Sequence, residues 1–249
     1  MVEFRDEDLS GSVFQDVDLS GARFSNVHLE NATIRGAWGE GLSISGGFDQ
    51  LMLDGIDVIP LWRAEMVRRH PEFALLPPAN ACDYRELWPI LERQWAETVT
   101  RVRALPEELL HERVEGEWSF IETTRHLLFV TDAWLSRAVL AEPAPYDPLG
   151  LQHDEAGVLE GVELLGSAAR PSLETVLSLR ADRMARVREV ISGLTDEQLA
   201  GDTEVTGPGY PEAGTYAVRR CLGAVVNEEW WHRRFAERDL EVLVGRSSA

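Results

Sequence analysis

Residues 227–234 read Asn227-Glu228-Glu229-Trp230-Trp231-His232-Arg233-Arg234, which places acidic, aromatic and imidazole side chains within one turn or two of each other. Glu228 precedes His232 by four residues, so on a helix both side chains project from one face with Cβ atoms about 5–6 Å apart. Such a pair can hold one divalent metal. Glu229, three residues before His232, is an equally good partner by spacing, and the spacing does not choose between the two acids.

The surrounding residues predict a helix over 216–243, because apolar side chains recur there at helical spacing. They are Leu222, Val225, Val226, Trp230, Phe235 and Leu240. The same periodicity and end signals predict three further long helices, over residues 84–104, 118–141 and 172–193. Four helices of this length predict an up-down four-helix bundle.

A further candidate ligand, His126, lies in the helix predicted over 118–141. His126 is followed there by Leu127, Leu128 and Phe129, so its imidazole belongs to an apolar segment. If the bundle places this helix beside the last one, His126 joins Glu228 and His232. Two imidazoles and a carboxylate leave coordination positions open for water or substrate, which is typical of catalytic sites. The alternative is that both histidines are hydrogen-bonded core residues.

Two connections are long for a bare bundle, 142–170 and 200–214. Loops of this length in a compact domain are usually functional or carry short structure of their own, which makes the first one a candidate lid. It contains His153, followed by Asp154 and Glu155. We predict His153 as a catalytic residue, a general base near the metal or a fourth ligand, and its alternative is a solvated loop residue.

The helix predicted over 172–193 carries a series of arginines that the spacing spreads around its circumference. A solvated face is the expected role of this series, ahead of a clamp for an anion: Arg180, Arg183, Arg186 and Arg188.

The N-terminal residues follow a different period. Apolar side chains recur every five residues from position 4 to position 34: Phe4, Leu9, Phe14, Leu19, Phe24, Leu29 and Ile34. A period of five fits neither a strand nor a helix. We therefore divide the chain into a repeat segment (1–50), a linker with a short helix (51–81) and the bundle (82–249).

Composition excludes some functions. The chain has 43 acidic against 24 basic residues, a net charge of −19, and no lysine. Nucleic-acid binding depends on basic side chains that displace counterions, so a nucleic-acid partner is disfavoured. No apolar run reaches the roughly 20 residues that cross a bilayer, and the first residues do not resemble a signal peptide. We expect a cytoplasmic protein with no membrane partner, from a GC-rich and apparently actinobacterial genome.

The repeat segment resembles the pentapeptide-repeat family, as in Asp18-Leu19-Ser20-Gly21-Ala22-Arg23-Phe24 and Val27-His28-Leu29-Glu30-Asn31-Ala32. That resemblance implies a right-handed quadrilateral β-solenoid, in which stacked coils share a core that no single repeat can form. Some members of the family mimic DNA. Here the segment gives only about two coils, so a structural cap or an interaction module is favoured.

The bundle resembles the DinB/YfiT-like superfamily through two stretches, Glu117-Trp118-Ser119-Phe120-Ile121-Glu122-Thr123-Thr124-Arg125-His126-Leu127 and residues 227–234. The family pattern has a Trp-Ser helix start, a His about eight residues later and a late His-x-x-x-His. Carried over, its ligands fall on His126 and His232. The remaining His position holds Glu228, a departure that changes which metal is favoured among zinc, nickel, iron and manganese.

The same resemblance implies a function. Characterised members include transferases and isomerases that use a small thiol, and mycothiol is the thiol expected in an actinobacterial host. The expected partners are then a small-molecule thiol and an electrophile, with S-transfer or isomerisation as the reaction. The alternative is a non-catalytic interaction protein, in which the bundle forms a homodimer and the solenoid docks a partner.

Overall fold

The computed structural model describes residues 3–25, 27–153 and 159–247. The chain separates into two compact units, Met1–Ile59 and Pro60–Ala249, which we call the repeat unit and the helical unit. Among the described residues, no helix is both long enough and apolar enough to cross a membrane.

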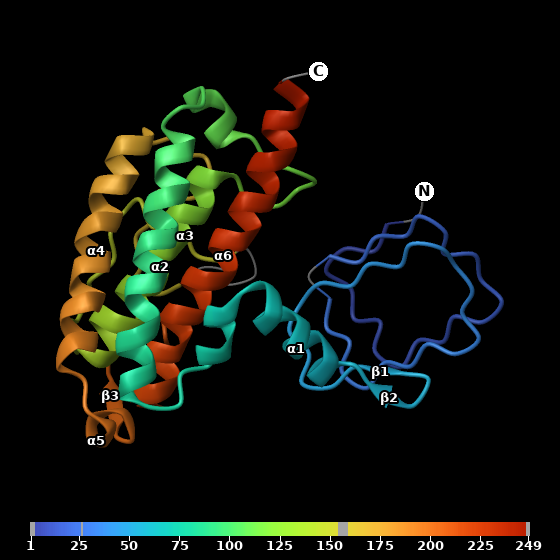
Figure 1. The fold of residues 1–249 in the computed structure, drawn as a ribbon, viewed down its shortest axis with the longest axis horizontal. Helices are drawn as coiled ribbons and strands as arrows, with labels where there is room; N and C mark the ends of the chain where they lie inside the picture. The colour runs from blue at the N-terminus through green and yellow to red at the C-terminus, as the bar shows by residue number, and fades with distance from the viewer. Residues whose placement is uncertain (1–2, 26, 154–158, 248–249) are drawn as a thin grey trace. The chain divides into compact units, whose positions relative to one another are not determined.

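Four long helices lie side by side in the helical unit (Figure 1). They are α2 (Ala81–Val102), α3 (Phe120–Thr131), α4 (Leu173–Gly193) and α6 (Val218–Ser247). Helices α2 and α3 each contact both α4 and α6. The core between them has two main apolar clusters, one with Trp88, Leu91 and Trp230 and one with Leu127, and Met184 of α4 packs against both.

The start of α3 is fixed by a reciprocal pair of hydrogen bonds. The Ser119 hydroxyl accepts from the Glu122 N–H, and the Glu122 carboxylate accepts from the Ser119 N–H. This capping box satisfies two donors that a helix end otherwise leaves unpaired. It fixes the first residue of α3, two turns before His126, and so fixes the face of the helix on which His126 lies.

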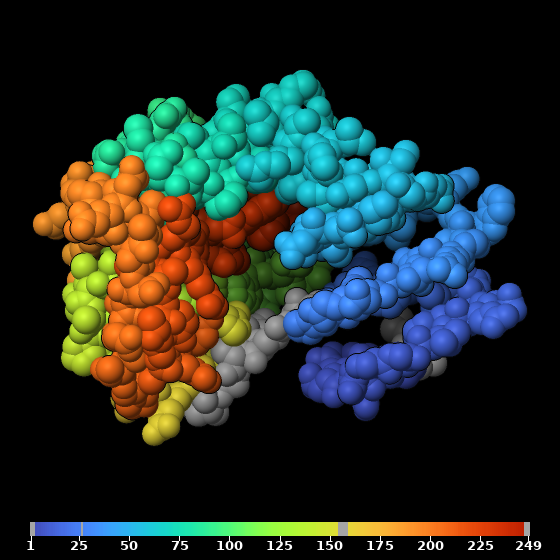
Figure 2. Space-filling view, turned by 90° about the horizontal axis from the view of Figure 1, so that it is seen from below, coloured from blue at the N-terminus to red at the C-terminus, as the bar shows by residue number. Residues whose placement is uncertain are grey.

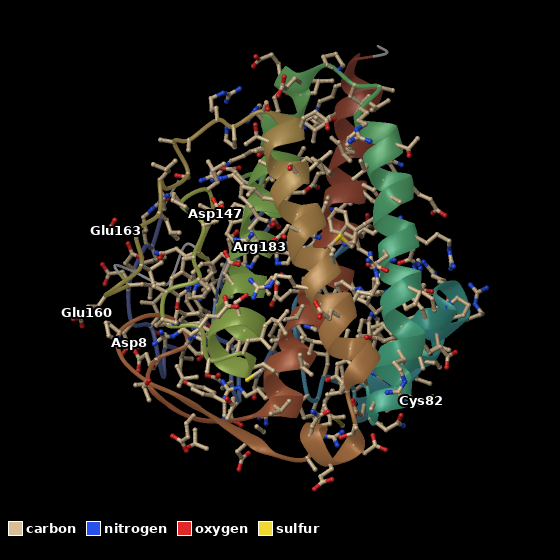
Figure 3. All side chains as sticks on the ribbon, turned by 90° about the vertical axis from the view of Figure 1, so that its left-hand side faces the viewer. Asp8, Cys82, Asp147, Glu160, Glu163 and Arg183 are labelled. Carbon is tan, nitrogen blue, oxygen red and sulfur yellow. The ribbon has the colours of Figure 1, made fainter. Side chains whose placement is uncertain are left out.

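Helix α3 continues without a break into a π-helical segment, η3 (Asp132–Val139), and together they account for the helix predicted over 118–141. Asp132 is fully buried, and its carboxylate accepts from Arg183 of α4 and from the Asp147 N–H. Burial raises the pKa of Asp132, although these hydrogen bonds oppose the rise. Figure 3 shows Arg183 and Asp147 on the same side of the unit.

Shorter elements connect the long helices. Those before α3 are α1 (Ile59–Arg69), η1 (Pro71–Leu75) and η2 (Glu107–His111), and those between α4 and α6 are α5 (Asp196–Leu199), β3 (Asp202–Val205) and β4 (Gly214–Ala217). Strands β3 and β4 pair antiparallel, from Asp202↔Ala217 to Val205↔Gly214. The connection at 200–214 is thus mostly a hairpin, and Figure 2 shows it at the surface with the start of α6, both in orange.

The segment predicted as a linker carries structure of its own. Its first part is a small hairpin of the repeat unit, β1 (Met52–Leu53) and β2 (Ile56–Asp57). Its second part packs on the helical unit, because Phe73 and Leu76 are buried in the same core as Trp230. His70, which follows α1, accepts a hydrogen bond from Arg234 of α6 at 2.5 Å.

The repeat unit has a backbone period of five. Every fifth described residue from 6 to 46 has a positive φ: Asp6, Gly11, Asp16, Gly21, Asn31, Gly36, Gly41 and Gly46. Small turns recur every ten residues, where the N–H groups of Ser12, Ala22 and Ala32 donate to the carbonyls three residues earlier. The described part of residues 1–50 forms no strand. The apolar side chains of the repeat are 42–76% exposed.

Candidate metal centre

Three potential ligands converge between α3 and α6. One ligand atom from each of His126, Glu228 and His232 lies within 4.8 Å of the other two. Glu228 Oε2 is 2.8 Å from His232 Nε2 and 3.6 Å from His126 Nε2. His126 is buried, whereas Glu228 and His232 are half-buried, so the cluster is reachable from solvent on the α6 side.

His126 is oriented by the long loop. Its Nδ1 lies 2.9 Å from the carbonyl oxygen of Leu151, which can only accept a hydrogen bond. Nδ1 therefore carries the hydrogen and Nε2 keeps its lone pair, as in many metal-binding histidines. Burial lowers the pKa of His126, so the imidazole is neutral at pH 7 and the lone pair is available.

The contact between His126 and Glu228 suits a cation. At 3.6 Å it is too long for a hydrogen bond, and it sets a nitrogen lone pair against a carboxylate oxygen. Glu228 Oε2 also lies 2.8 Å from His232 Nε2, a hydrogen-bonding distance that favours the ionised carboxylate. The site thus presents two nitrogen donors and one ionised oxygen, a set that zinc and other divalent transition metals accept.

The structure also separates the two candidate acids of α6. Glu229 is buried and makes two hydrogen bonds with Arg180 of α4, at 2.6 and 2.7 Å. Consecutive helical residues point about 100° apart, so one acid faces α4 while the other faces His126. The prediction that the arginines of this helix form a solvated face is therefore wrong for Arg180 and Arg183. Each forms an ion pair with a buried acid of a neighbouring helix.

An aromatic wall borders the cluster. The ring of Trp118 stacks on His232, with centroids 5.7 Å apart, and lies 4.5 Å from the centroid of His126. Its indole N–H is buried and has no hydrogen-bond partner among the described residues. Trp118 therefore brings an unused donor to the edge of the site.

Buried arginines fasten the two loops that approach the site. Arg125, next to His126, is fully buried and donates to the carbonyls of Leu149, Gly166 and Ala169. The Leu151 N–H donates in turn to the Arg125 carbonyl. The predicted lid at 142–170 is thus tied at both ends to the helical turn that carries His126.

The hairpin loop is held in a similar way by Arg137 of η3, which donates to the carbonyls of Thr206, Gly207 and Pro211. Tyr146 of the long loop adds two bonds to one residue: its hydroxyl donates to the Tyr210 carbonyl and accepts from the Tyr210 N–H. These contacts place the Tyr210 ring on Phe129, one turn after His126, with centroids 5.7 Å apart.

His153 does not join the three ligands. It is half-buried, and its ring meets Tyr210 edge to face at 5.7 Å. It is not among the residues of the 4.8 Å cluster, so the geometry does not support a fourth ligand, and its role as general base stays a prediction. The neighbouring acids, Asp154 and Glu155, lie outside the described residues.

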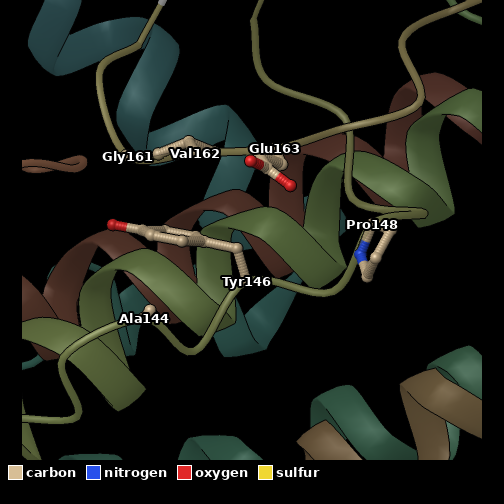
Figure 4. A pocket seen from close by; sticks show the side chains of 6 residues that line it. All are labelled: Ala144, Tyr146, Pro148, Gly161, Val162 and Glu163. Carbon is tan, nitrogen blue, oxygen red and sulfur yellow. The ribbon is translucent and has the colours of Figure 1, made fainter.

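A pocket opens between the two arms of the long loop (Figure 4). It is lined by Ala144, Tyr146, Pro148, Gly161, Val162 and Glu163. None of the three candidate ligands lines it. The candidate metal centre is therefore a separate feature, built from helices rather than from loop residues.

Sequence reasoning found the three clustered residues but missed the two arginines and Tyr210. Arg125 and Arg137 carried a usable signal, since each lies within an apolar helical run where a charge needs buried partners. Tyr210 lies in a segment rich in Gly and Pro, and no local pattern indicated that it would pack against α3.

Comparison with known proteins gives two family matches. The model described as the DinB superfamily matches residues 90–236. The model described as pentapeptide repeats matches residues 4–38, in eight copies. No curated protein and no solved structure matches the chain.

Proposed function

The chain belongs to the DinB superfamily, whose members bind divalent metals, and we propose that His126, Glu228 and His232 hold one such metal here. The observation that carries the proposal is the convergence of three ligand atoms within 4.8 Å, with one imidazole locked in the ligating tautomer. Histidine ligands are typically fixed in this way by a carbonyl or carboxylate on the other ring nitrogen.

We propose that the site serves transfer or isomerisation chemistry with a small thiol, mycothiol being the first to test. A bound divalent metal would lower the pKa of a thiol and favour the reactive thiolate. The chain itself contributes the solvent-accessible side of the cluster and the Trp118 ring beside both imidazoles. The absence of lysine supports the choice of thiol only through the host that it indicates.

Metal analysis tests the site. We expect about one divalent ion per purified chain, and loss of that ion in His126→Ala and His232→Ala. Glu228→Gln is expected to weaken affinity at least roughly tenfold, because it replaces a charged ligand. Glu229→Gln is the matched control, since its amide oxygen can still accept one of the two hydrogen bonds from Arg180 and its side chain does not face the cluster. A native protein without stoichiometric metal, or an equal loss in Glu229→Gln, would contradict the assignment.

Activity is tested separately, with metal-loaded and metal-free protein. We expect only the loaded protein to accelerate the reaction of mycothiol with monochlorobimane, an electrophile that becomes fluorescent when it is thiolated. Glutathione and bacillithiol serve as comparison thiols. Equal rates with and without metal would remove the thiol-transfer proposal and leave the metal site in place.

A second role concerns the repeat unit, for which we propose a right-handed quadrilateral β-solenoid that docks a protein. Its five-residue backbone period and its exposed apolar side chains support this role. A second copy of the chain is the first partner to test. Sedimentation of wild type against a Phe14→Ser/Phe24→Ser variant should show a dimer that the variant loses. A monomer at all concentrations would exclude self-association.

A further inference from the structure

The two candidate histidine ligands are held by different kinds of contact. Nδ1 of His126 lies 2.9 Å from the Leu151 carbonyl oxygen, so a hydrogen bond fixes the plane of that ring. Among the described residues, no group forms a hydrogen bond with Nδ1 of His232. Metal-binding histidines usually use their second nitrogen in such a bond. The ring of His232 must therefore be oriented in another way.

The contact of His232 with Glu228 does not orient the ring in a site that holds a metal. Glu228 Oε2 lies 2.8 Å from His232 Nε2, and both residues are candidate ligands of the same ion. Nε2 cannot both donate a hydrogen to the carboxylate and offer its lone pair to a metal. The ring then depends on its remaining neighbours.

Those neighbours are aromatic rings. Trp118 stacks on His232, with ring planes 20° apart and centroids 5.7 Å apart. Phe235, one turn later on α6, meets His232 edge to face, with ring planes 87° apart and centroids 5.8 Å apart. Offset stacking and edge-to-face contact are the two favoured arrangements of aromatic pairs. Together they limit rotation of the His232 imidazole, because a turned ring would collide with the indole.

Trp118 contacts the other imidazole as well. Its ring centroid lies 4.5 Å from that of His126, and the centroids of His126 and His232 are 4.8 Å apart. Phe235 stacks on Trp231 and contacts His232, but it has no ring contact with His126. The indole of Trp118 therefore bridges one candidate ligand on α3 and one on α6.

The backbone next to Trp118 is fixed independently of any metal. Ser119 follows Trp118 and exchanges two hydrogen bonds with Glu122 at the start of α3. Arg113 donates three further hydrogen bonds to the Glu122 carboxylate, at 2.6–3.1 Å. The indole is thus attached to a part of the chain that holds its place before an ion binds.

We propose that Trp118 is a positioning residue, whose indole orients His232 for metal binding in place of the hydrogen bond that orients His126. This role rests on the proposed function, because it concerns the same candidate metal centre. Trp118 acts through the two imidazoles and is not itself a ligand. Its removal should therefore weaken metal binding and change the coordination of the bound ion.

Titration of the full-length protein with Co²⁺ against a competing chelator tests the role, because the visible absorption of bound Co²⁺ reports its coordination. Trp118→Leu removes the ring but keeps an apolar side chain. It should weaken Co²⁺ affinity roughly tenfold or more and alter the absorption bands at saturation. Trp118→Phe keeps a ring and should restore most of the affinity and of the spectrum.

The matched control is Trp134→Leu. Trp134 is also a half-buried tryptophan, but its ring contacts Tyr210 and Tyr216 rather than an imidazole. The substitution should change Co²⁺ affinity less than about twofold, because Trp134 contacts no candidate ligand. Thermal unfolding of the metal-free variants separates a loss of affinity from a loss of stability.

A second measurement needs no metal. In metal-free protein, the ring current of the indole should displace the proton NMR signals of the His126 and His232 rings. Trp118→Leu should return these signals toward their ordinary positions, and Trp134→Leu should leave them unchanged. Displaced signals in a wild-type protein that binds no metal would support the contact of Trp118 with His232 while the proposed metal function fails.

Four outcomes would overturn the proposal. The first is wild-type Co²⁺ affinity and absorption in Trp118→Leu. The second is an equal loss of affinity in Trp118→Leu and Trp134→Leu, which indicates a general loosening of the helical unit. The third is a loss in Trp118→Phe as large as in Trp118→Leu, which shows that an aromatic ring is not sufficient. The fourth is imidazole signals at ordinary positions in the wild type.

Discussion

The two units of this chain differ in how deeply they bury their apolar side chains. Leu127 and Leu128 of α3 are fully buried, whereas Phe24 of the repeat unit is 64% exposed. The apolar face of a helix is buried against neighbouring helices of the same unit. A five-residue ladder is covered only by successive coils, and a short segment offers few of them. The period of a sequence therefore predicts the local structure, while burial depends on how many neighbours the chain supplies.

A pair of identical substitutions measures this contrast directly. Phe120→Ala in the helical unit should reduce the free energy of unfolding by about 4 kcal/mol, because Phe120 is buried. At concentrations where the chain is monomeric, Phe24→Ala should change it by less than about 0.5 kcal/mol, because most of the ring is then in water. Urea unfolding followed by tryptophan fluorescence gives both values. A large loss in Phe24→Ala would show that the ladder is covered in solution.

Buried charge is the next largest effect expected in the helical unit. Arg180→Met leaves Glu229 buried without a partner and should cost about 3 kcal/mol. The control on the same helix is Arg188→Met, whose pair with Glu92 is largely exposed and should matter by less than about 1 kcal/mol. Similar losses in the two variants would mean that the buried pair is not special.

Adding a single methyl group to the hairpin loop, at Gly209, should lower the stability of the protein. Gly209 has a φ of +132°, and a Cβ there would lie 2.7 Å from the Tyr146 hydroxyl and 2.9 Å from Arg137 Cζ. Gly209→Ala should therefore destabilise the protein by about 2 kcal/mol. Gly207→Ala has a positive φ but open space around it, and should cost less. Thermal unfolding measures both losses, and equal losses in the two variants would contradict a role for the close packing at Gly209.

The smallest effect expected is a pH dependence at His70. Burial and then the charge of Arg234 lower the pKa of His70, so the folded protein binds this proton less readily than the unfolded chain. Stability should therefore fall as pH drops below the unfolded pKa of about 6.5, by at most about 1.4 kcal/mol per pH unit.

His70→Gln is the comparison for this effect, since Gln accepts from Arg234 without titrating. The other charged groups near His70 are the same in both proteins, namely Glu72, Arg69 and Arg233. Unfolding at pH 7.5 and pH 5.5 should show a steeper loss in the wild type. Equal slopes would mean that His70 does not contribute.

Much of the helical unit follows from the sequence, because apolar period and capping residues act locally. The predicted helices all overlap observed ones, and His126, Glu228 and His232 meet as their places on two helices suggest. The choice between Glu228 and Glu229 could not be made from the sequence, because it depends on a contact with another helix. Arg180 of α4 pairs with Glu229, which leaves Glu228 facing His126. The β3–β4 hairpin and Tyr210 were missed because they are positioned by contacts distant in sequence, from Arg137 and Tyr146.

The fastening of the long loop has a consequence for how this protein can change over evolution. Arg125 holds Leu149, Gly166 and Ala169, and the Leu165 N–H donates to the Pro148 carbonyl, so the loop is closed at its base. Residues 159–164, which lie between Leu151 and these later anchors, make none of the anchoring contacts, so their side chains can change while Leu151 keeps its hydrogen bond with His126. The helical unit can therefore keep its three candidate ligands in place beside a loop whose side chains vary.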